Sequence, residues 1–228
     1  MKISILTLFP EMFSGPFNYS IVKRAADKKL IDINLVNIRD FGLGKHKIVD
    51  DKPFGGGSGM ILKANVLCSA IDSVKDKKLS KNEQKVFLLG AHGKTFNWTV
   101  ASDFSKLNHL ILLCGHYEGV DERIKKFIDG EISIGDFITT GGEIPAMLIT
   151  DAVVRLVKGV LKDGVGTSES FFENLEYPHY TSPREFKGLT VPDVLLSGNH
   201  GKIQNWKKEK SLEITKKLRP DLLEAPTS

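Results

Sequence analysis

The sequence predicts an α/β fold, in which a mostly parallel sheet is flanked by helices, followed by a small, mainly helical C-terminal domain. Short apolar runs alternate with longer segments of helical periodicity, and three apolar runs end in glycine-bearing turns. Strands and helices that alternate along a chain favour parallel pairing with helices covering the sheet. A strongly basic helical segment after residue 199 marks the second domain.

The first part of the chain predicts two strands separated by a helix. Lys2–Phe9 is a strand that ends at Pro10, Tyr19–Leu30 has helical spacing, and Ile31–Ile38 alternates apolar and polar residues. A long loop then contains the glycine-rich stretch Gly55–Gly59. This stretch lacks the lysine and Ser/Thr of a phosphate-binding loop and does not directly follow a strand. We interpret it as a substrate-contacting or merely structural loop.

The middle of the chain continues the alternation of strands and helices. We expect helices at residues 62–74, 95–107 and 121–129, and strands at residues 86–89 and 110–114. The first of these strands opens into a turn at Gly90–Gly93, and the second ends at Gly115. With a third strand end near Ile138, three loops would meet at one edge of the sheet, where open α/β sheets bind ligands.

Ser133–Ala146 is the stretch on which we place the ligand site. It is a short apolar strand, a loop containing Gly141 and Gly142, and the start of a helix at Glu143. A glycine pair allows bare backbone to approach a ligand, because no Cβ blocks the contact. The alternative is that these glycines serve turn geometry alone.

The helix predicted at Glu143–Val157 is apolar on most sides. Such a helix must be buried all round, either in a core or against a second subunit. Arg155 interrupts its apolar surface, and Asp151, four residues earlier, is its expected ion-pair partner by spacing.

The C-terminal third changes in character. The glycine-containing segment 159–168 predicts a mobile linker, Ser170–Leu175 a short helical turn, and Ile203–Leu218 a basic helix. Asn199–Pro220 contains seven basic and two acidic residues, a net charge of +5. We therefore expect a main domain at 1–160, a flexible linker at 161–175, and a small basic domain at 176–228. Its basic helix is either a solvated face, which is the commoner case, or a surface for phosphate and base contacts with RNA.

Composition limits the classes of protein. A net charge of +4 over 228 residues permits nucleic-acid binding without requiring it. Cys68 and Cys114 lie far apart in apolar runs, which is typical of core thiols in a reducing compartment. The apolar N-terminal run is too short for a signal peptide, and no run has transmembrane length. We expect a soluble cytoplasmic protein.

Several motifs together resemble the bacterial tRNA (guanine-N1)-methyltransferase family, which comprises SPOUT-type enzymes. Their order and spacing cover nearly the whole chain. The motifs are Leu8–Phe13, Val49–Met60, Gly115–Arg123, Ser133–Asp136, Gly141–Ala146, Pro178–Thr181 and Val191–His200.

This resemblance implies a deep trefoil knot near the ligand loops and S-adenosylmethionine as methyl donor. It also implies dependence on magnesium, for which the sequence identifies no ligands. A homodimer is implied, in which each subunit completes the active site of the other. The implied substrate is tRNA, methylated at N1 of the guanosine on the 3′ side of the anticodon.

The resemblance also assigns roles to individual residues. Glu169 takes the place of the general base and Arg155 that of the group that stabilises the developing negative charge. The family usually has aspartate at the position of Glu169, so this residue departs from the pattern. Glu118, Asp136 and Glu173 are the alternative bases. The implied cofactor residues are Leu89, Gly90, Gly115, Tyr117, Glu118, Ile134, Gly135, Asp136, Phe137, Ile138, Thr139 and Gly142, with Asp136 either a contact or a turn cap.

Two other functions fit the same sequence. A related SPOUT enzyme would share the cofactor site but methylate another RNA position, such as a ribose hydroxyl. A non-catalytic RNA-binding protein would use the basic segment alone. A dinucleotide oxidoreductase is disfavoured, because the glycine fingerprint of that class is missing.

Overall fold

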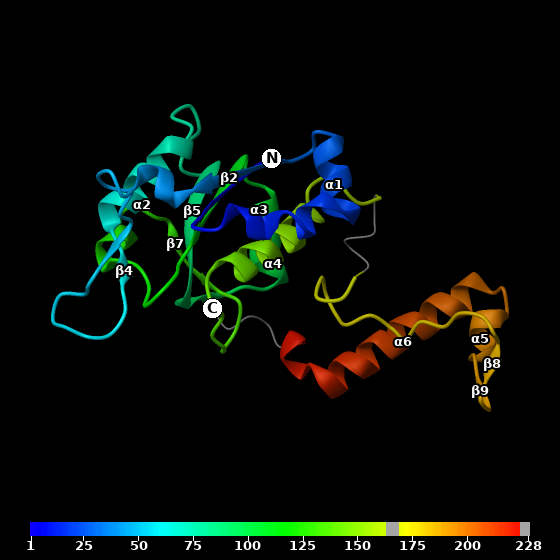
Figure 1. Ribbon diagram of the computed structural model, residues 1–228. Coiled ribbons are helices and arrows are strands. Elements are labelled where there is room, and N and C mark those ends of the chain that lie inside the picture. The colour runs from blue at the N-terminus through cyan, green and yellow to red at the C-terminus, as the bar shows by residue number, and fades with distance from the viewer. Residues whose placement is uncertain (163–168, 224–228) are drawn as a thin grey trace. The chain divides into compact units, whose positions relative to one another are not determined.

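The computed structural model describes residues 1–162 and 169–223. The chain divides into two compact units, Met1–Lys162 and Asp163–Ser228, and both are drawn in Figure 1. Part of the predicted linker, residues 163–168, lies outside the described residues.

The first unit is built on a five-stranded sheet in which all paired strands are parallel. The strand order is β2-β1-β6-β5-β7. The bounds are β1 Lys2–Thr7, β2 Asp32–Asn37, β5 Gln84–Thr95, β6 His109–Cys114 and β7 Gly130–Ser133. All six residues of the central strand β6 are buried, as expected where both faces of a parallel sheet are covered. The predicted α/β class is confirmed.

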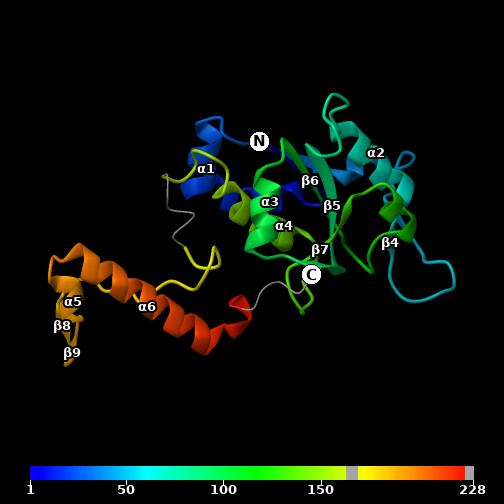
Figure 2. The same ribbon diagram turned by 180° about the vertical axis from the view of Figure 1, so that it is seen from behind.

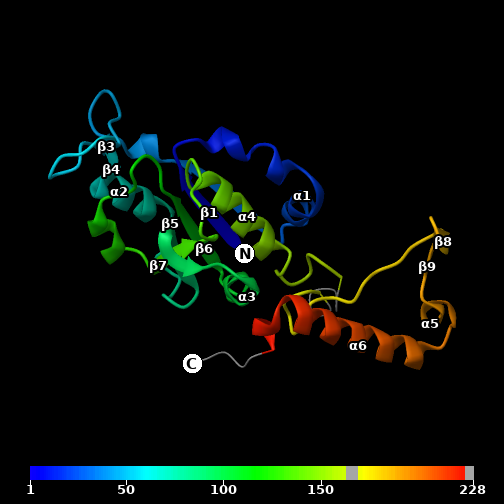
Figure 3. The same cartoon turned by 90° about the horizontal axis from the view of Figure 1, so that it is seen from below.

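Helices cover both faces of this sheet. One apolar cluster joins α1 (Ser20–Asp27), α3 (Trp98–Ser105) and α4 (Glu143–Val154) to one face, and another joins α2 (Ala64–Val74) to the opposite face. Figures 2 and 3 show these helices around the strands, and in Figure 3 the strands lie between α2 and α4. Side chains of β1 alternate between the clusters, with Ile5 in the first and Leu6 in the second.

Short elements complete this unit. They are the 3₁₀ helices η1 Pro10–Phe13, η2 Pro16–Asn18, η3 Ile38–Phe41 and η4 Glu122–Lys126, and the two-stranded hairpin β3 Asp50–Asp51 with β4 Ile61–Leu62.

Two predictions for this unit were wrong in detail. The strand predicted to end at Leu89 continues to Thr95, because the chain rejoins β7 after residues Gly90–Gly93: Leu89 and Lys94 both pair with Ile132. The helix predicted at residues 121–129 is only the 3₁₀ helix η4. There the Asp121 carboxylate accepts from the Arg123 N–H at 3.0 Å and starts a tight turn rather than a full α-helix.

Helix α4 was predicted to be buried all round, and within this chain it is not. Ala146, Ile149 and Val153 are fully buried, whereas Ile144 and Leu148 are 48% and 46% exposed. Ile144 and Leu148, one turn apart, thus form an apolar stripe of α4 that the described residues of the first unit leave uncovered.

The second unit has a different construction. It contains the hairpin β8 Glu185–Phe186 with β9 Leu189–Thr190, then α5 Asp193–Leu196, α6 His200–Leu218 and η5 Pro220–Leu222. The predicted basic helix is confirmed as α6, whose Asn199 cap accepts from the Lys202 N–H at 3.1 Å. The predicted helical turn at Ser170–Leu175 is wrong, because Phe171 has a φ of 75°, which a right-handed helix does not allow.

Among the described residues, none of the helices combines the length and apolar character that a membrane span requires.

Candidate cofactor pocket

A cavity of about 430 Å³ opens where β6 and β7 end, beside the unpaired segment within β5. Three segments line it: the loop within β5, the loop after β6, and the loop between β7 and α4. Its volume lies within the range of small-molecule pockets, roughly 300–1,000 Å³. The carboxyl edge of a parallel sheet is where such ligands bind in α/β proteins. The expected meeting of three loops is therefore present in the structure.

Most residues proposed from the sequence line this one cavity. They are Leu89, Gly90, Gly115, Tyr117, Glu118, Ile134, Gly135, Phe137, Ile138, Thr139 and Gly142. Asp136 is the exception, since it is not among the lining residues. Whether any of them contacts a cofactor stays a prediction.

Glycine is required where two of the loops touch. The Gly142 N–H donates to the Gly115 carbonyl oxygen at 2.8 Å. A Cβ on Gly142 would lie 2.6 Å from the Cα of Cys114, closer than any side chain tolerates. Bare backbone therefore forms this part of the wall, as predicted for a glycine pair ahead of a helix.

Gly135 has a different reason to be glycine. Its φ is 140°, and a Cβ would lie 2.8 Å from the ring of Phe137. The Ser133 hydroxyl lies 3.2 Å from the Gly135 N–H. Because β7 ends at Ser133, this turn begins earlier than the predicted strand end near Ile138.

A buried carboxylate lies at the start of α4. Glu143 is 2% exposed, and its Oε1 accepts from the Thr7 hydroxyl at 2.7 Å, which links α4 to the end of β1. The N-terminal turn of a helix stabilises a negative charge. Burial, and then the charge of Glu143, raise the pKa of the Cys114 thiol well above its usual range. Cys114 is thus a neutral core thiol, as its sequence context predicts.

Sequence reasoning missed the charged part of the pocket wall. His92, Glu122, Lys125 and Glu131 also line the cavity. Glu131 lies on β7 beside the buried Ile132. The four residues of β7 have the sequence GEIS, which is too short and too polar to give a clear strand pattern, and nothing in the sequence places β7 beside the looped segment of β5.

The glycine-rich stretch Gly55–Gly59 belongs to an arm between β3 and β4. Backbone bonds join the base of this arm to the pocket loop: Glu118 N–H donates to Met60 O at 3.1 Å, and Leu62 N–H to Gly119 O at 3.1 Å. A Cβ on Gly59 would lie 2.4 Å from Cγ of Glu118. The arm is thus attached directly to a wall of the pocket.

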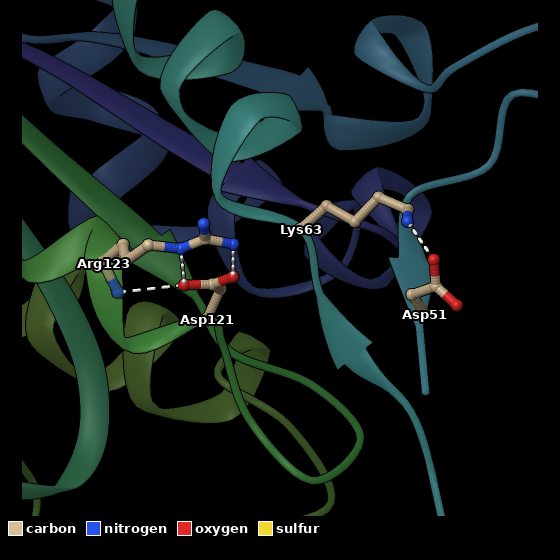
Figure 4. A network of polar contacts seen from close by, with 4 residues as sticks. All are labelled: Asp51, Lys63, Asp121 and Arg123. Carbon is tan, nitrogen blue, oxygen red and sulfur yellow. Dashed lines mark hydrogen bonds and ion pairs between the residues drawn. The ribbon is translucent and has the colours of Figure 1, made fainter. Parts of the chain in front are cut away.

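Two ion pairs stand at this junction, as Figure 4 shows. Lys63 pairs with Asp51 across the hairpin, and Arg123 pairs with Asp121 at 2.6 Å. Hydrogen bonds from Arg123 lower the pKa of Asp121 to about 2, and those from Lys63 lower the pKa of Asp51. Both carboxylates are therefore charged at neutral pH.

The two residues expected to catalyse the reaction lie in different units. Arg155 caps the C-terminus of α4 in the first unit, and Glu169 lies in the second. The ion pair expected between Asp151 and Arg155 is not among the contacts within the described first unit, where the Arg155 N–H donates to the Asp151 carbonyl oxygen at 3.2 Å. The catalytic roles of Arg155 and Glu169 stay predictions.

Within residues 1–162 and 169–223, no group of three or more His, Cys, Asp or Glu side chains is arranged to hold a metal ion.

Comparison with known proteins gives a consistent result. The family model described as tRNA (Guanine-1)-methyltransferase TrmD matches residues 1–225. A tRNA (guanine-N(1)-)-methyltransferase of Dictyoglomus turgidum is 54% identical over 98% of this chain and 90% of its own length. Proteins of the same name from Clostridium beijerinckii and Carboxydothermus hydrogenoformans are also 54% identical, over 97% and 98% of this chain and 92% and 87% of their own lengths. With a match this long and this close, the chain belongs to the tRNA (guanine-1)-methyltransferase family.

Proposed function

We propose that this protein transfers a methyl group from S-adenosylmethionine to N1 of the guanosine on the 3′ side of the anticodon in tRNA. The observation that carries the proposal is the pocket formed by the ends of β6 and β7 and the unpaired segment of β5, in a chain that matches this family over residues 1–225. Its residues have the chemistry that such a methyl donor needs.

The lining of the pocket fits S-adenosylmethionine in two respects. Leu89, Ile134, Ile138 and Pro145 offer apolar surface to an adenosyl group, and the glycine backbone at Gly115 and Gly142 offers close polar contacts. Glu118, Glu122 and Glu131 outnumber Lys125 among the charged side chains, which favours a cationic sulfonium. When bound, S-adenosylmethionine would supply the electrophilic methyl group, and its carbon–sulfur bond would break to leave a neutral thioether.

The chain must also prepare the nucleophile. N1 of guanine carries a proton at neutral pH, so a base has to accept it as the nitrogen–carbon bond forms. Glu169 takes that proton in the proposal, and Arg155 stabilises the negative charge that moves toward the neighbouring carbonyl oxygen. Glutamate reaches one methylene further than the aspartate usual in the family.

The second unit is proposed to bind tRNA. Its helix α6 carries most of the basic excess, and the Lys207 ammonium lies 4.7 Å from the ring centre of Tyr177. Lysines contact phosphates, and aromatic rings stack on unpaired bases. The domain boundaries 1–160, 161–175 and 176–228 and the trefoil knot belong to the same proposal.

A homodimer is proposed from α4. Ile144 and Leu148 leave an apolar stripe exposed on one chain, and burying it against a second copy would remove that surface from water. Sedimentation should show a dimer, and a stable, active monomer would refute this part of the proposal.

The decisive experiment uses labelled S-adenosylmethionine with unmodified tRNA transcripts, with and without magnesium. Transcripts with guanosine or adenosine 3′ of the anticodon are compared and the methylated base is mapped. Label on guanine N1 in the guanosine transcript alone supports the proposal. Label on a ribose or another base would indicate a related enzyme with another target, and RNA binding without cofactor binding would indicate a non-catalytic protein.

The base is tested separately. Glu169→Gln should abolish turnover while S-adenosylmethionine still binds, because the amide cannot accept the N1 proton. Turnover near that of the parent protein would indicate that the general base is another residue, such as Glu118, Asp136 or Glu173.

A further inference from the structure

Part of the pocket wall contributed by β5 is not paired with a neighbouring strand. Leu89 and Lys94 pair with the same residue of β7, so the four residues Gly90–Gly93 stand outside the ladder. Gly90, Ala91 and His92 nevertheless line the cavity. A segment that loses its ladder bonds needs other anchors if it is to keep one shape.

The carboxylate of Glu131 supplies such an anchor. Its Oε1 accepts from the His92 N–H at 3.3 Å and lies 3.8 Å from the His92 ring nitrogen Nδ1. The side chain of Glu131 is only 12% exposed. It also fills the space beside Gly90, because a Cβ there would lie 2.3 Å from Glu131 Oε1.

The second oxygen of the same carboxylate reaches another wall. Glu131 Oε2 lies 3.5 Å from the ammonium of Lys125, which belongs to η4 and also pairs with Glu122 at 3.0 Å. One side chain on β7 thus contacts the looped segment of β5 on one side and η4, which follows the β6 loop, on the other. A hydrogen bond to a charged group is also stronger than one to a neutral acceptor.

We propose that Glu131 is a positioning residue, which holds the Gly90–Gly93 segment in the shape that receives the cofactor. Gly90 is glycine because the carboxylate occupies the space of its side chain. This inference rests on the proposed function only for the identity of the ligand.

The chain offers a matched control. Asp129, two residues earlier, also anchors β5 to this region, since its Oδ2 accepts from the Val86 N–H at 2.8 Å. Asp129 does not line the pocket. Removing either carboxylate deletes a side-chain contact to β5, but only Glu131 holds the pocket segment.

The first measurement is hydrogen exchange of the His92 amide in the protein without cofactor. Glu131→Ala should accelerate this exchange and leave the Val86 amide protected, and Asp129→Ala should do the reverse. This readout does not depend on the proposed activity. Unchanged protection of His92 in Glu131→Ala would overturn the inference.

The second measurement is the affinity for S-adenosylmethionine and for its demethylated product, by calorimetry. Glu131→Ala should weaken the binding of both about tenfold, the effect of losing one hydrogen bond to a charged group. Glu131→Gln, which retains an acceptor oxygen, should recover most of the loss, and Asp129→Ala should bind as the parent protein does. Equal losses of affinity in Glu131→Ala and Asp129→Ala would show that Glu131 has only a general structural role and would overturn the inference.

The third measurement tests the pairing with Gly90. Gly90→Ala should weaken binding in the parent protein, because its Cβ displaces the carboxylate, but have little further effect in the Glu131→Ala background. If the losses of binding free energy in the two single variants add fully in the double variant, the contact between Gly90 and Glu131 is refuted. A parent protein that bound no S-adenosylmethionine would instead contradict the proposed function, and the exchange measurement would still decide the role of Glu131.

Discussion

The two units of this chain are stabilised by different forces. In the sheet unit the largest fully buried side chains are all apolar, among them Phe13, Ile5 and Leu112. Within residues 169–223 of the second unit, Thr215 alone is buried. Its hydroxyl accepts from the Leu175 N–H at 2.9 Å and donates to the Ser211 carbonyl oxygen at 2.8 Å. The first unit thus depends on apolar burial, and the second on a few individual polar contacts.

The largest expected difference between the units comes from truncating one leucine in each. Leu112→Ala removes a side chain with 0% exposure and should lower the free energy of unfolding by about 2–5 kcal/mol. Leu212→Ala on α6, where the residue is 38% exposed, should lower it by less than about 1 kcal/mol.

Trp98 and Trp206 report the two units separately in urea denaturation followed by fluorescence. Each is observed after replacing the other with phenylalanine. Similar decreases in the free energy of unfolding for both leucine variants would contradict the view that apolar burial stabilises mainly the first unit.

The pH dependence of the sheet unit should trace to His109. This residue is 1% exposed, and its ring nitrogens lie 2.9 Å from the Ser4 hydroxyl and 2.8 Å from the Gln84 side-chain oxygen. Burial, and then the charge of Lys2, lower its pKa from 6.5 to about 4, against the opposing charges of Asp76 and Asp32.

The unfolded chain therefore binds this proton at a higher pH than the folded chain does. The stabilisation is complete above pH 6.5 and is lost as the pH falls toward 4, by up to about 3 kcal/mol. Denaturation at several pH values should show this slope, and His109→Gln should flatten it. The exposed His46 provides the control, since His46→Gln should leave the slope unchanged.

Replacing a buried threonine with valine should lower the stability of the second unit but not that of the first. Thr215→Val leaves the Leu175 N–H without its acceptor and should destabilise the second unit by about 1–3 kcal/mol. Thr150 on α4 is equally buried, and its hydroxyl has no hydrogen-bond partner in the described part of the chain. Thr150→Val should therefore be neutral or stabilising.

Hydrogen exchange of the Leu175 amide provides the measurement for Thr215→Val, and thermal denaturation that for Thr150→Val. Equal destabilisation by the two replacements would show that the hydrogen bonds of Thr215 do not contribute to the stability of the second unit.

The smallest effect should separate the units by their RNA contacts. If the second unit binds tRNA, Lys208→Gln on the exposed face of α6 should weaken binding modestly and reduce the slope of log affinity against log salt by about 1. Lys81→Gln, at an exposed site of the sheet unit, should change neither. Filter binding over a series of salt concentrations distinguishes the two outcomes.

Much of the sheet unit could be predicted, because its local patterns and its tertiary packing agree. The continuous apolar run at β6 favours a strand that is buried on both faces, and the helical spacing of α1 and α2 favours helices with one buried face. The structure shows both. The glycines at 115, 135 and 142 identify turns whether or not the partner segment is known. The second unit was harder, because its short elements bury little and leave weak patterns, as the turn at Phe171 shows.

The sequence by itself determined the alternation of strands and helices, the three loops that form the pocket, and the family, since apolar periodicity and glycine geometry are local properties. Only the tertiary structure decided that β5 resumes its pairing with β7 after four unpaired residues. It also decided that Glu131 lies against Gly90, because contacts across 41 residues of chain depend on strand order and register. The exposed stripe of α4 was also decided only by the tertiary structure. A helix that is apolar on most sides does not indicate by its sequence which side will be covered.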